Sequence, residues 1–321
     1  MQERSAKLIM ITVLTLNPSI DRSYVLDEFV TGKVQRARNV IATAGGKGLN
    51  VSRVANCLGG KVCCLGFLGG FTGEFIKKKI EAEGLINRFT PIGGTTRICM
   101  NFRDGSGAST EVLENGPKIL PYEMKQFEQE LRNVLKDTKI LVASGSLAQG
   151  LPKDYYGQIA KICREENIKF ILDSSGESLY LAIKDRPFLI KPNEEELEYL
   201  TGIPIKNDKD VFLASSKVLE MGAENVCVSL GRQGMMLNGS LGRFIVHIPT
   251  VEAVNTVGCG DSLVAGLAYA LNEGYHILQM LKFANGCGIS NALHKGVGQI
   301  DPVQVDTFAN QVTVIPYVNI A

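Results

Sequence analysis

The sequence lacks the short motifs that mark several large enzyme classes. It has no G-x-S-x-G, no H-E-x-x-H, no G-x-x-x-x-G-K-[ST] and no complete G-x-G-x-x-G segment. These absences argue against common serine hydrolases, zinc proteases, P-loop nucleotide hydrolases and dinucleotide-dependent dehydrogenases. Only three histidines are present, His247, His276 and His294, and none lies beside a serine or cysteine in a nucleophile context. Any chemistry must therefore rest on other residue types.

Long apolar runs and C-x-x-C cysteine pairs are missing as well. Because no run of about 18 apolar residues occurs, no transmembrane helix is predicted, and the polar segment 1–7 lacks the apolar stretch of a signal peptide. The eight cysteines form no C-x-x-C pair, which disfavours a zinc site. A chain with this much core needs no disulfide framework. The sequence predicts a reduced, cytoplasmic protein.

Charge of one sign is not in excess either. The formal net charge of the 321 residues is +1, so no overall field favours nucleic acid or a membrane surface as partner. A hydrophobic content of 45% supplies ample core for one large domain or two modest ones. An anionic ligand would have to be held by local charges.

Short apolar runs alternate with amphipathic stretches along the chain. Candidate strands are residues 9–16, 61–67, 140–143, 170–172, 188–190 and 226–229. Candidate helices are residues 48–58, 73–83, 122–136, 153–166, 194–200, 210–221, 260–272 and 277–293. Continuous apolar strands separated by helices are typical of a parallel sheet covered on both faces. With right-handed crossovers, the pattern predicts a three-layer α/β/α sandwich around a mostly parallel central sheet.

Two segments depart from this rhythm. Residues 23–41 and 96–113 alternate polar and apolar side chains without a helical period, which predicts strands of a small antiparallel sheet. With no internal repeat or linker, we expect one domain over residues 1–321, with a β lid at about 17–41 and 95–113. An exposed apolar face on such a sheet favours dimerisation.

The segment 255–262, Asn-Thr-Val-Gly-Cys-Gly-Asp-Ser, runs directly into an apolar helix. Glycines allow backbone N–H groups to converge at a helix start, where the dipole favours an anion. Asp261 then lies beside that anion site, where it can accept a proton from a hydroxyl that attacks phosphorus. The alternative interpretation is an ordinary helix cap, since Asp is a preferred capping residue.

A second glycine-rich segment, residues 44–51, also opens a helix. Gly45 and Gly46 allow close approach of a ligand, Lys47 offers a cation for a phosphate, and Asn50 can hydrogen-bond sugar hydroxyls. A flexible turn with a solvated lysine explains the same residues equally well.

Two further motifs follow predicted strands. In residues 191–196, Asn193 and Glu196 are three apart and can converge on a hydrated Mg²⁺, with Lys191 facing nucleotide phosphates. Glutamates at a helix start also compensate the helix dipole without any ligand. The segment 229–234, Ser-Leu-Gly-Arg-Gln-Gly, ends another strand. Ligands of open parallel sheets bind outside the carboxyl ends of the strands, so the shared location of these motifs favours one site.

Together the four motifs resemble the PfkB/ribokinase family of carbohydrate kinases. The segments Gly-Gly-Lys-Gly-Leu-Asn-Val, Lys-Pro-Asn-x-x-Glu, Ser-Leu-Gly-x-x-Gly and Val-Gly-x-Gly-Asp carry the resemblance, in an order and spacing that fit nearly the whole chain. The branch of 1-phosphofructokinase and tagatose-6-phosphate kinase is the most similar, through segments 15–21, 66–74, 144–147 and 172–177. The resemblance implies a ribokinase-like fold, ATP and Mg²⁺ as cofactors, and a homodimer formed through the β lid.

The resemblance also implies roles for single residues. Asp261 would be the catalytic base, Gly258, Cys259 and Gly260 the anion hole, and Asn193 and Glu196 the water-mediated Mg²⁺ site. The ATP site would comprise Lys191, Asn193, Ser229, Leu230, Gly231, Arg232, Gln233, Gly234, Gly260 and Asn285. The sugar phosphate would contact Asp21, Gly45, Gly46, Lys47, Asn50, Arg97 and Ser146, with Lys33 or Arg36 reaching in from a neighbouring subunit.

The implied reaction is phosphoryl transfer from ATP to a ketohexose phosphate. Fructose 1-phosphate, giving fructose 1,6-bisphosphate, is preferred here, with tagatose 6-phosphate second and fructose 6-phosphate third. A non-catalytic sugar-phosphate sensor on the same fold is a remote alternative. Asn255 replaces the Asp of many family members, which puts a monovalent-cation requirement in doubt. Cys259 at a helix start is either a small space-filling residue or an oxidisable thiol of lowered pKa.

Overall fold

The computed structural model describes residues 10–318, so the polar segment 1–7 lies outside the described range. Its centre is an eleven-stranded sheet. The strands are β1 (Met10–Thr15), β4 (Val62–Gly69), β5 (Ile86–Asn87), β6 (Thr90–Ile92), β9 (Thr138–Ser144), β10 (Lys169–Asp173), β11 (Leu189–Ile190), β12 (Asn225–Ser229), β13 (Met235–Gly239), β14 (Gly242–His247) and β15 (Thr313–Pro316). Their order is β15-β14-β13-β12-β11-β10-β9-β1-β4-β5, with β6 paired to β4.

The strands from β12 through β5 run parallel, and β13, β14 and β15 add an antiparallel end. Successive side chains of a strand point to opposite faces, and both faces here are apolar. In β9, Ile140 and Val142 belong to one hydrophobic core, and Leu141 and Ala143 belong to the other. Burial on both faces explains why these strands are continuous apolar runs in the sequence.

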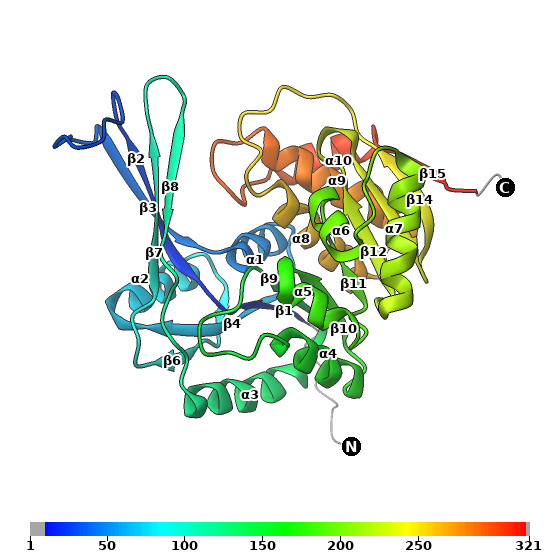
Figure 1. The fold of residues 1–321 in the computed structure, drawn as a ribbon, viewed down its shortest axis with the longest axis horizontal. Coiled ribbons are helices and arrows are strands. Elements are labelled where there is room, and N and C mark those ends of the chain that lie inside the picture. The colour runs from blue at the N-terminus through cyan, green and yellow to red at the C-terminus, as the bar shows by residue number, and fades with distance from the viewer. Residues whose placement is uncertain (1–9, 319–321) are drawn as a thin grey trace, which may run out of the picture.

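Helices cover both faces of the large sheet (Figure 1). One layer contains α1 (Lys47–Cys57), α2 (Gly70–Ala82), α8 (Cys259–Glu273), α9 (Ile277–Ala292) and α10 (Pro302–Ala309). The other contains α3 (Pro121–Leu135), α4 (Tyr155–Glu165), α5 (Gly176–Ile183), α6 (Glu194–Thr201) and α7 (Asp208–Met221). The predicted three-layer α/β/α sandwich with a mostly parallel sheet is therefore confirmed. Among residues 10–318, no helix has the length and apolar character needed to span a bilayer.

A separate four-stranded sheet, called the small sheet below, projects from this body (Figure 1). It consists of β2 (Ser19–Val25), β3 (Asn39–Gly45), β7 (Arg97–Arg103) and β8 (Ser109–Leu113), in the order β3-β2-β7-β8. Its two outer pairs are antiparallel, and they join through the parallel pair of β2 with β7. The predicted small sheet is thus present as two antiparallel hairpin-like pairs.

One part of the strand prediction is wrong. Residues 26–38, inside the predicted strand segment 23–41, form a loop between β2 and β3. Gly32 adopts a positive φ of 76° there, and the segment is rich in charged side chains that fit neither face of a sheet. Polar and apolar side chains continue to alternate through this loop, so the alternation alone could not show where the strand ends and the turn begins.

Candidate functional site

The start of α8 places Asp261 at one end of the large sheet. Gly258 precedes the helix with a φ of 85°, and an ideal Cβ there would lie 2.6 Å from Cγ1 of Val297. A side chain would therefore be strained and crowded at this position. Asp261 follows in the first helical turn and is only 6% exposed. The predicted glycine-rich turn opening into an apolar helix is confirmed.

Asn50 brings the second glycine-rich motif to this carboxylate. The helix α1 begins directly after Gly46, and Asn50 lies in its first turn, buried. Its amide Nδ2 donates a hydrogen bond of 2.8 Å to Oδ2 of Asp261. Two motifs that are 211 residues apart in the sequence thus meet at one pair of atoms.

A buried ion pair lies beside the start of α8. Nζ of Lys191, which follows β11, is 3.1 Å from Oδ1 of Asp173 at the end of β10. The hydroxyl of Ser144 donates to the other Asp173 oxygen over 3.0 Å. Nζ of Lys191 also lies 3.6 Å from where a Cβ on Gly260 would be, so the ammonium group faces the glycine turn.

Sequence reasoning assigned no role to Asp173. The available signal was an aspartate at the carboxyl end of an apolar run, residues 170–172, which is where ligand-binding groups of a parallel sheet collect.

The two buried carboxylates experience opposite electrostatic surroundings. Burial raises the pKa of Asp261 to about 6, and the charge of Asp173 adds to that rise, against the hydrogen bond from Asn50 and the charges of Lys47 and Lys191. Burial would raise the pKa of Asp173 as well, but the attraction of Lys191 and Lys47 outweighs it and holds that pKa below its usual range. Asp173 is thus kept ionised, whereas Asp261 is adapted to exchange a proton near neutral pH.

The segments 191–196 and 229–234 lie side by side. The backbone N–H of Ser229 donates to the carbonyl of Pro192 over 3.0 Å, and Asn193 and Ser229 form a parallel bridge. After Ser229 the chain turns through a short 3-10 helix, Gly231–Gln233, and the N–H of Leu230 donates to the carbonyl of Gly234 over 2.9 Å. The predicted convergence of these two motifs at strand ends is confirmed, and their contact with a nucleotide stays a prediction.

Asn285, predicted near the adenine, is buried within α9. Its side-chain amide donates to the carbonyl of Leu281, one turn earlier, over 2.8 Å. A role in nucleotide binding stays a prediction for this residue.

Asn193 and Glu196 form a capping box at the start of α6. The N–H of Glu196 donates to Oδ1 of Asn193 over 2.7 Å, and the N–H of Asn193 donates to Oε2 of Glu196 over 2.9 Å. These bonds leave Oε1 of Glu196 without a hydrogen-bond partner among the described residues. One carboxylate oxygen facing water fits a hydrated Mg²⁺ held through its water shell. Between residues 10 and 318, no group of three or more His, Cys, Asp and Glu side chains forms a direct metal cage.

Asp21 and Gly45 face each other in the small sheet. The two strands β2 and β3 pair Asp21 with Thr43, and an ideal Cβ on Gly45 would overlap the Asp21 carboxyl group. Only glycine therefore fits at position 45 with this carboxylate in place. The hydroxyl of Ser19 donates to Oδ1 of Asp21 over 2.6 Å. Burial raises the pKa of Asp21, although the charges of Arg97 and Arg53 oppose the rise.

Arg97 lines a cavity of about 410 Å³ where the small sheet meets the body. Its guanidinium donates to the carbonyl of Asn17 over 3.0 Å and to the carbonyl of Glu114 over 3.0 Å. The cavity is lined by Gly94, Thr95, Arg97, Glu114, Asn115, Gly116, Pro117 and Lys118. Two cations therefore border this space, and neither Asp261 nor Asn50 is among its lining residues.

Asn17 was missed as a site residue. It is 8% exposed, donates to Ser146 Oγ over 3.2 Å, and its Oδ1 has no hydrogen-bond partner within the described chain. The backbone carbonyl of Asn17 also accepts a hydrogen bond from the Arg97 guanidinium. Asn17 therefore links the predicted substrate contacts Arg97 and Ser146. The sequence offered no signal beyond its place in the segment 15–21.

The remaining predicted cations occupy different places. Lys47 is the exposed first residue of α1, and its charge lowers the pKa of both Asp173 and Asp261. Lys33 and Arg36 lie exposed on the loop 26–38, which is attached to the small sheet. Their predicted contribution to the site of a neighbouring subunit stays a prediction.

The prediction of a lowered thiol pKa at Cys259 is wrong. Burial raises the pKa of this thiol, and the nearby Asp261 carboxyl adds to the rise, against the hydrogen bond with Asn291. Desolvation and a neighbouring negative charge outweigh the helix start, so the thiolate is disfavoured. The space-filling interpretation accounts for Cys259.

Comparisons with known proteins point to one family. Residues 14–303 match the model of the pfkB family carbohydrate kinases. The tagatose-6-phosphate kinase of Staphylococcus epidermidis is 41% identical over 309 residues, which cover 95% of this chain and 99% of the relative. The structure of phosphofructokinase-2 from Escherichia coli in complex with potassium is similar with a TM-score of 0.88 at 28% identity, and the match covers 95% of this chain and 99% of that one.

A ribokinase from Arabidopsis thaliana, solved with ribose and ATP, shares the fold with a TM-score of 0.79 at 21% identity, covering 94% of this chain and 98% of the ribokinase. The family match spans the small sheet, both glycine-rich helix starts and the strand-end motifs. This chain belongs to the pfkB family of carbohydrate kinases.

Proposed function

We propose that this chain transfers the γ-phosphoryl group of ATP to a hydroxyl group of a ketohexose phosphate. The observation that carries the proposal is the position of Asp261. This carboxylate is buried in the first turn of α8, accepts a hydrogen bond from Asn50 and has a pKa raised to about 6. A general base works best when its pKa lies near the working pH.

In this reaction Asp261 accepts the proton of the sugar hydroxyl while the hydroxyl oxygen bonds to the γ-phosphorus. The bond between that phosphorus and the oxygen bridging to the β-phosphate breaks, and ADP leaves with the electron pair. The backbone N–H groups at Gly258, Cys259 and Gly260 would donate hydrogen bonds to the negatively charged oxygens of the transferred group. The dipole of α8 also favours negative charge there. Lys191 faces this turn and neutralises phosphate charge, with Asp173 holding it in place.

In this proposal the nucleotide binds along the segment 229–234 and the start of α6. Mg²⁺, when bound, would supply positive charge that neutralises the phosphate groups. The free Oε1 of Glu196 would contact its water shell, and Asn193 would hold Glu196 in orientation through the capping box. The remaining ATP contacts are those that the family resemblance implies.

On the sugar side, Asp21 and Asn50 offer hydrogen bonds to hydroxyl groups. Arg97 and Lys118 border the cavity beside the small sheet, and Lys47 opens α1. These cations suit the phosphate that the sugar already carries.

The choice of sugar shifts from the sequence-based preference. A relative named tagatose-6-phosphate kinase is 41% identical over almost the full length of both chains. Tagatose 6-phosphate therefore becomes the first candidate and fructose 1-phosphate the second. In both reactions the ketose bears a phosphate at one terminal carbon and accepts the new phosphoryl group at the other, so one pair of anion sites serves either.

The small sheet is proposed as a lid over the sugar. It carries Asp21 and Arg97, and it projects from the body (Figure 1). A lid that closes over bound substrate excludes water and limits wasteful hydrolysis of ATP. A homodimer through the small sheet is proposed as well.

The test is ADP release by the purified protein with MgATP, measured in parallel with tagatose 6-phosphate, fructose 1-phosphate and fructose 6-phosphate. We expect the highest kcat/KM with tagatose 6-phosphate. A higher value with fructose 1-phosphate would reverse the order of the two candidates. No ADP release with any of the three, combined with binding of a sugar phosphate, would contradict the catalytic proposal and favour a sensor.

A further inference from the structure

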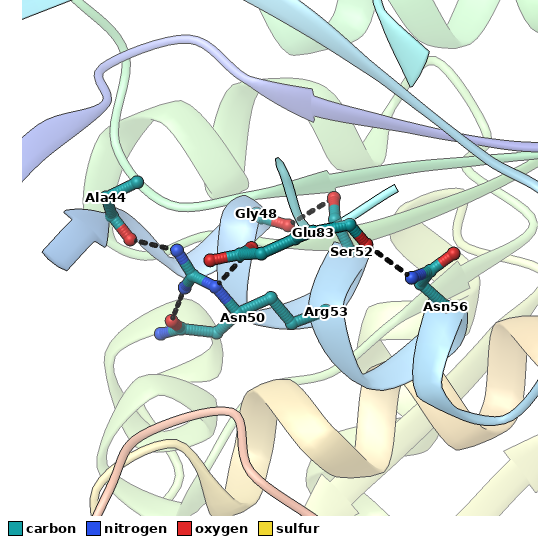
Figure 2. A network of polar contacts seen from close by, with 7 residues as sticks. All are labelled: Ala44, Gly48, Asn50, Ser52, Arg53, Asn56 and Glu83. Carbon is teal, nitrogen blue, oxygen red and sulfur yellow. Dashed lines mark hydrogen bonds and ion pairs between the residues drawn. The ribbon is translucent and has the colours of Figure 1, made fainter. Parts of the chain in front are cut away.

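Arg53 lies at the centre of a polar network on α1 (Figure 2). Its Nε forms an ion pair with Oε2 of Glu83 at the end of α2, over 2.8 Å. Its Nη1 donates to Oδ1 of Asn50 over 3.2 Å, and its Nη2 donates to the carbonyl of Ala44 in β3. The Arg53 side chain is 17% exposed, and its bonds to Asn50 and Ala44 are partly buried, whereas the Glu83 side chain is 36% exposed.

Arg53 and Asp261 together determine which way the Asn50 amide points. A guanidinium has only donors, so the Asn50 atom that faces Arg53 must be the oxygen. The amide nitrogen is then directed to the opposite side, where it donates to Oδ2 of Asp261 over 2.8 Å. If the amide were rotated by half a turn, its oxygen would meet the Asp261 carboxylate and its nitrogen would meet Arg53. Both contacts would be repulsive.

We propose that Arg53 is a positioning residue that fixes the Asn50 amide so that it donates to Asp261, and that it thereby controls the protonation of the base. This inference rests on the proposed function for its meaning in catalysis. Arg53 does not touch the reacting atoms itself. It acts through Asn50, and its bond to the carbonyl of Ala44 links the same amide to the small-sheet strand β3.

The charged and titratable groups around Asp261 set the expected direction of the effect. Asp173 raises its pKa, Lys47 and Lys191 lower it, and the Cys259 thiol is kept neutral by burial. The Asn50 hydrogen bond favours the ionised carboxylate and lowers the pKa. Losing that bond therefore raises the pKa of Asp261, so the base becomes protonated, and inactive, at higher pH than before.

The decisive variant is Arg53→Met, which keeps the apolar stem and removes every donor. A hydrogen bond to a charged group corresponds to about one pKa unit. We expect the acid limb of kcat/KM to move upward by about one pH unit, while kcat on the alkaline plateau, measured with saturating sugar phosphate, stays within about twofold. Loss of packing alone would lower the plateau and leave the limb in place.

Two further variants separate positioning from stability. Arg53→Lys keeps the charge, but one ammonium group cannot replace the fork that reaches Glu83, Asn50 and Ala44 together, so we expect an upward shift here too. This variant decides the matter if Arg53→Met does not fold. Asn56→Ala is the matched control, because Asn56 joins α1 to the Glu83 carbonyl over 3.0 Å without touching Asn50. We expect its acid limb to coincide with that of the unaltered protein.

A second readout needs no substrate. The ¹³C carboxyl resonance of Asp261, assigned by its disappearance in Asp261→Asn, is titrated in the unaltered protein and in Arg53→Met. We expect its midpoint to rise in Arg53→Met. An unchanged midpoint, or an equal rise in Asn56→Ala, would overturn the inference. If the unaltered protein shows no kinase activity but the midpoint rises, the proposed function fails and the positioning role remains.

Discussion

Asp261 and Asp173 are both buried at the same end of the large sheet, yet their pKa values are driven in opposite directions. The difference comes from their partners, because Asp173 has the full charge of Lys191 at 3.1 Å, whereas Asp261 has the neutral amide of Asn50. Carboxyl groups separated in this way divide the tasks of holding charge and moving protons. A division of tasks is also expected at Glu196, between the two oxygens of its carboxylate.

Glu196 has one oxygen in the capping box and one directed away from it, so its two roles can be tested separately. Glutamine also completes a capping box but carries no charge. For Glu196→Gln we expect an unfolding free energy within about 0.5 kcal/mol of the unaltered protein. We also expect the Mg²⁺ concentration for half-maximal rate to rise about tenfold, as for the loss of an outer-shell ligand partner.

The control is Glu196→Ala, which removes the cap as well and costs about 1 kcal/mol of stability. Chemical denaturation and Mg²⁺ titration of the rate measure the two effects. An unchanged Mg²⁺ requirement in Glu196→Gln would leave this residue with a capping role alone.

At the scale of single residues, the sequence located those that lie in compact motifs. Asp261, Asn50 and Lys191 each belong to a glycine-rich or strand-end segment, and the structure brings them together. Asp173 and Arg53 were not located, because each is one polar residue in an otherwise ordinary strand or helix. Their importance comes from contacts across the fold, to Lys191 and to Asn50, that no local pattern records.

Among the elements, the small sheet exposes apolar side chains on both faces, with Ile41 and Leu113 on the face of Asp21. The strand register places Tyr24 opposite Val40 and opposite Phe102, and Met100 opposite Val112, on the face away from Asp21. Val40 is 49% exposed and Val112 is 46% exposed. An exposed apolar face on a projecting sheet is a typical protein contact surface. It is the face through which we propose the homodimer to form.

Val40→Glu combined with Val112→Glu tests that proposal. Two charges on an apolar contact cannot be buried without a partner, so we expect the altered protein to be a monomer. Light scattering coupled to size exclusion gives the mass directly. Ile41→Glu, on the opposite face of the same strand, is the control and should remain dimeric. The dimer proposal for this face would be wrong if the double variant kept the mass of the unaltered protein.

The elements that the sequence predicted share a physical property. Parallel strands buried on both faces are continuous apolar runs, while helices such as α3 and α4 have one apolar face and α8 is apolar over most of its length, so β1, β4, β9 and β10 and most helices were found. The hairpin β13–β14, the short helix α5 and the loop 26–38 were not. The hairpin lies toward the antiparallel end of the sheet, α5 has only eight residues, and the loop turns at Gly32, so none of them gives a strong period in the sequence.

For the whole molecule, parallel strand order explains why four separate motifs lie close together. The carboxyl ends of β9, β10, β11 and β12 all lie at the same edge of the sheet, and Ser144, Asp173, Lys191 and Ser229 lie at or directly after those ends. The starts of α1 and α8 add Asn50 and Asp261 there. The fold and this convergence could be predicted from the sequence. The choice of sugar could not, because it depends on contacts with individual hydroxyl groups.

The central claim is that Asp261 removes the proton from the sugar hydroxyl. It is tested most directly by the turnover of Asp261→Asn, which keeps the size of the side chain and an oxygen that can accept from Asn50. With MgATP and the preferred ketohexose phosphate, we expect kcat to fall by about 10² to 10⁴, while ATP and the sugar phosphate still bind. A turnover within about threefold of the unaltered protein would contradict the role of Asp261 as the base.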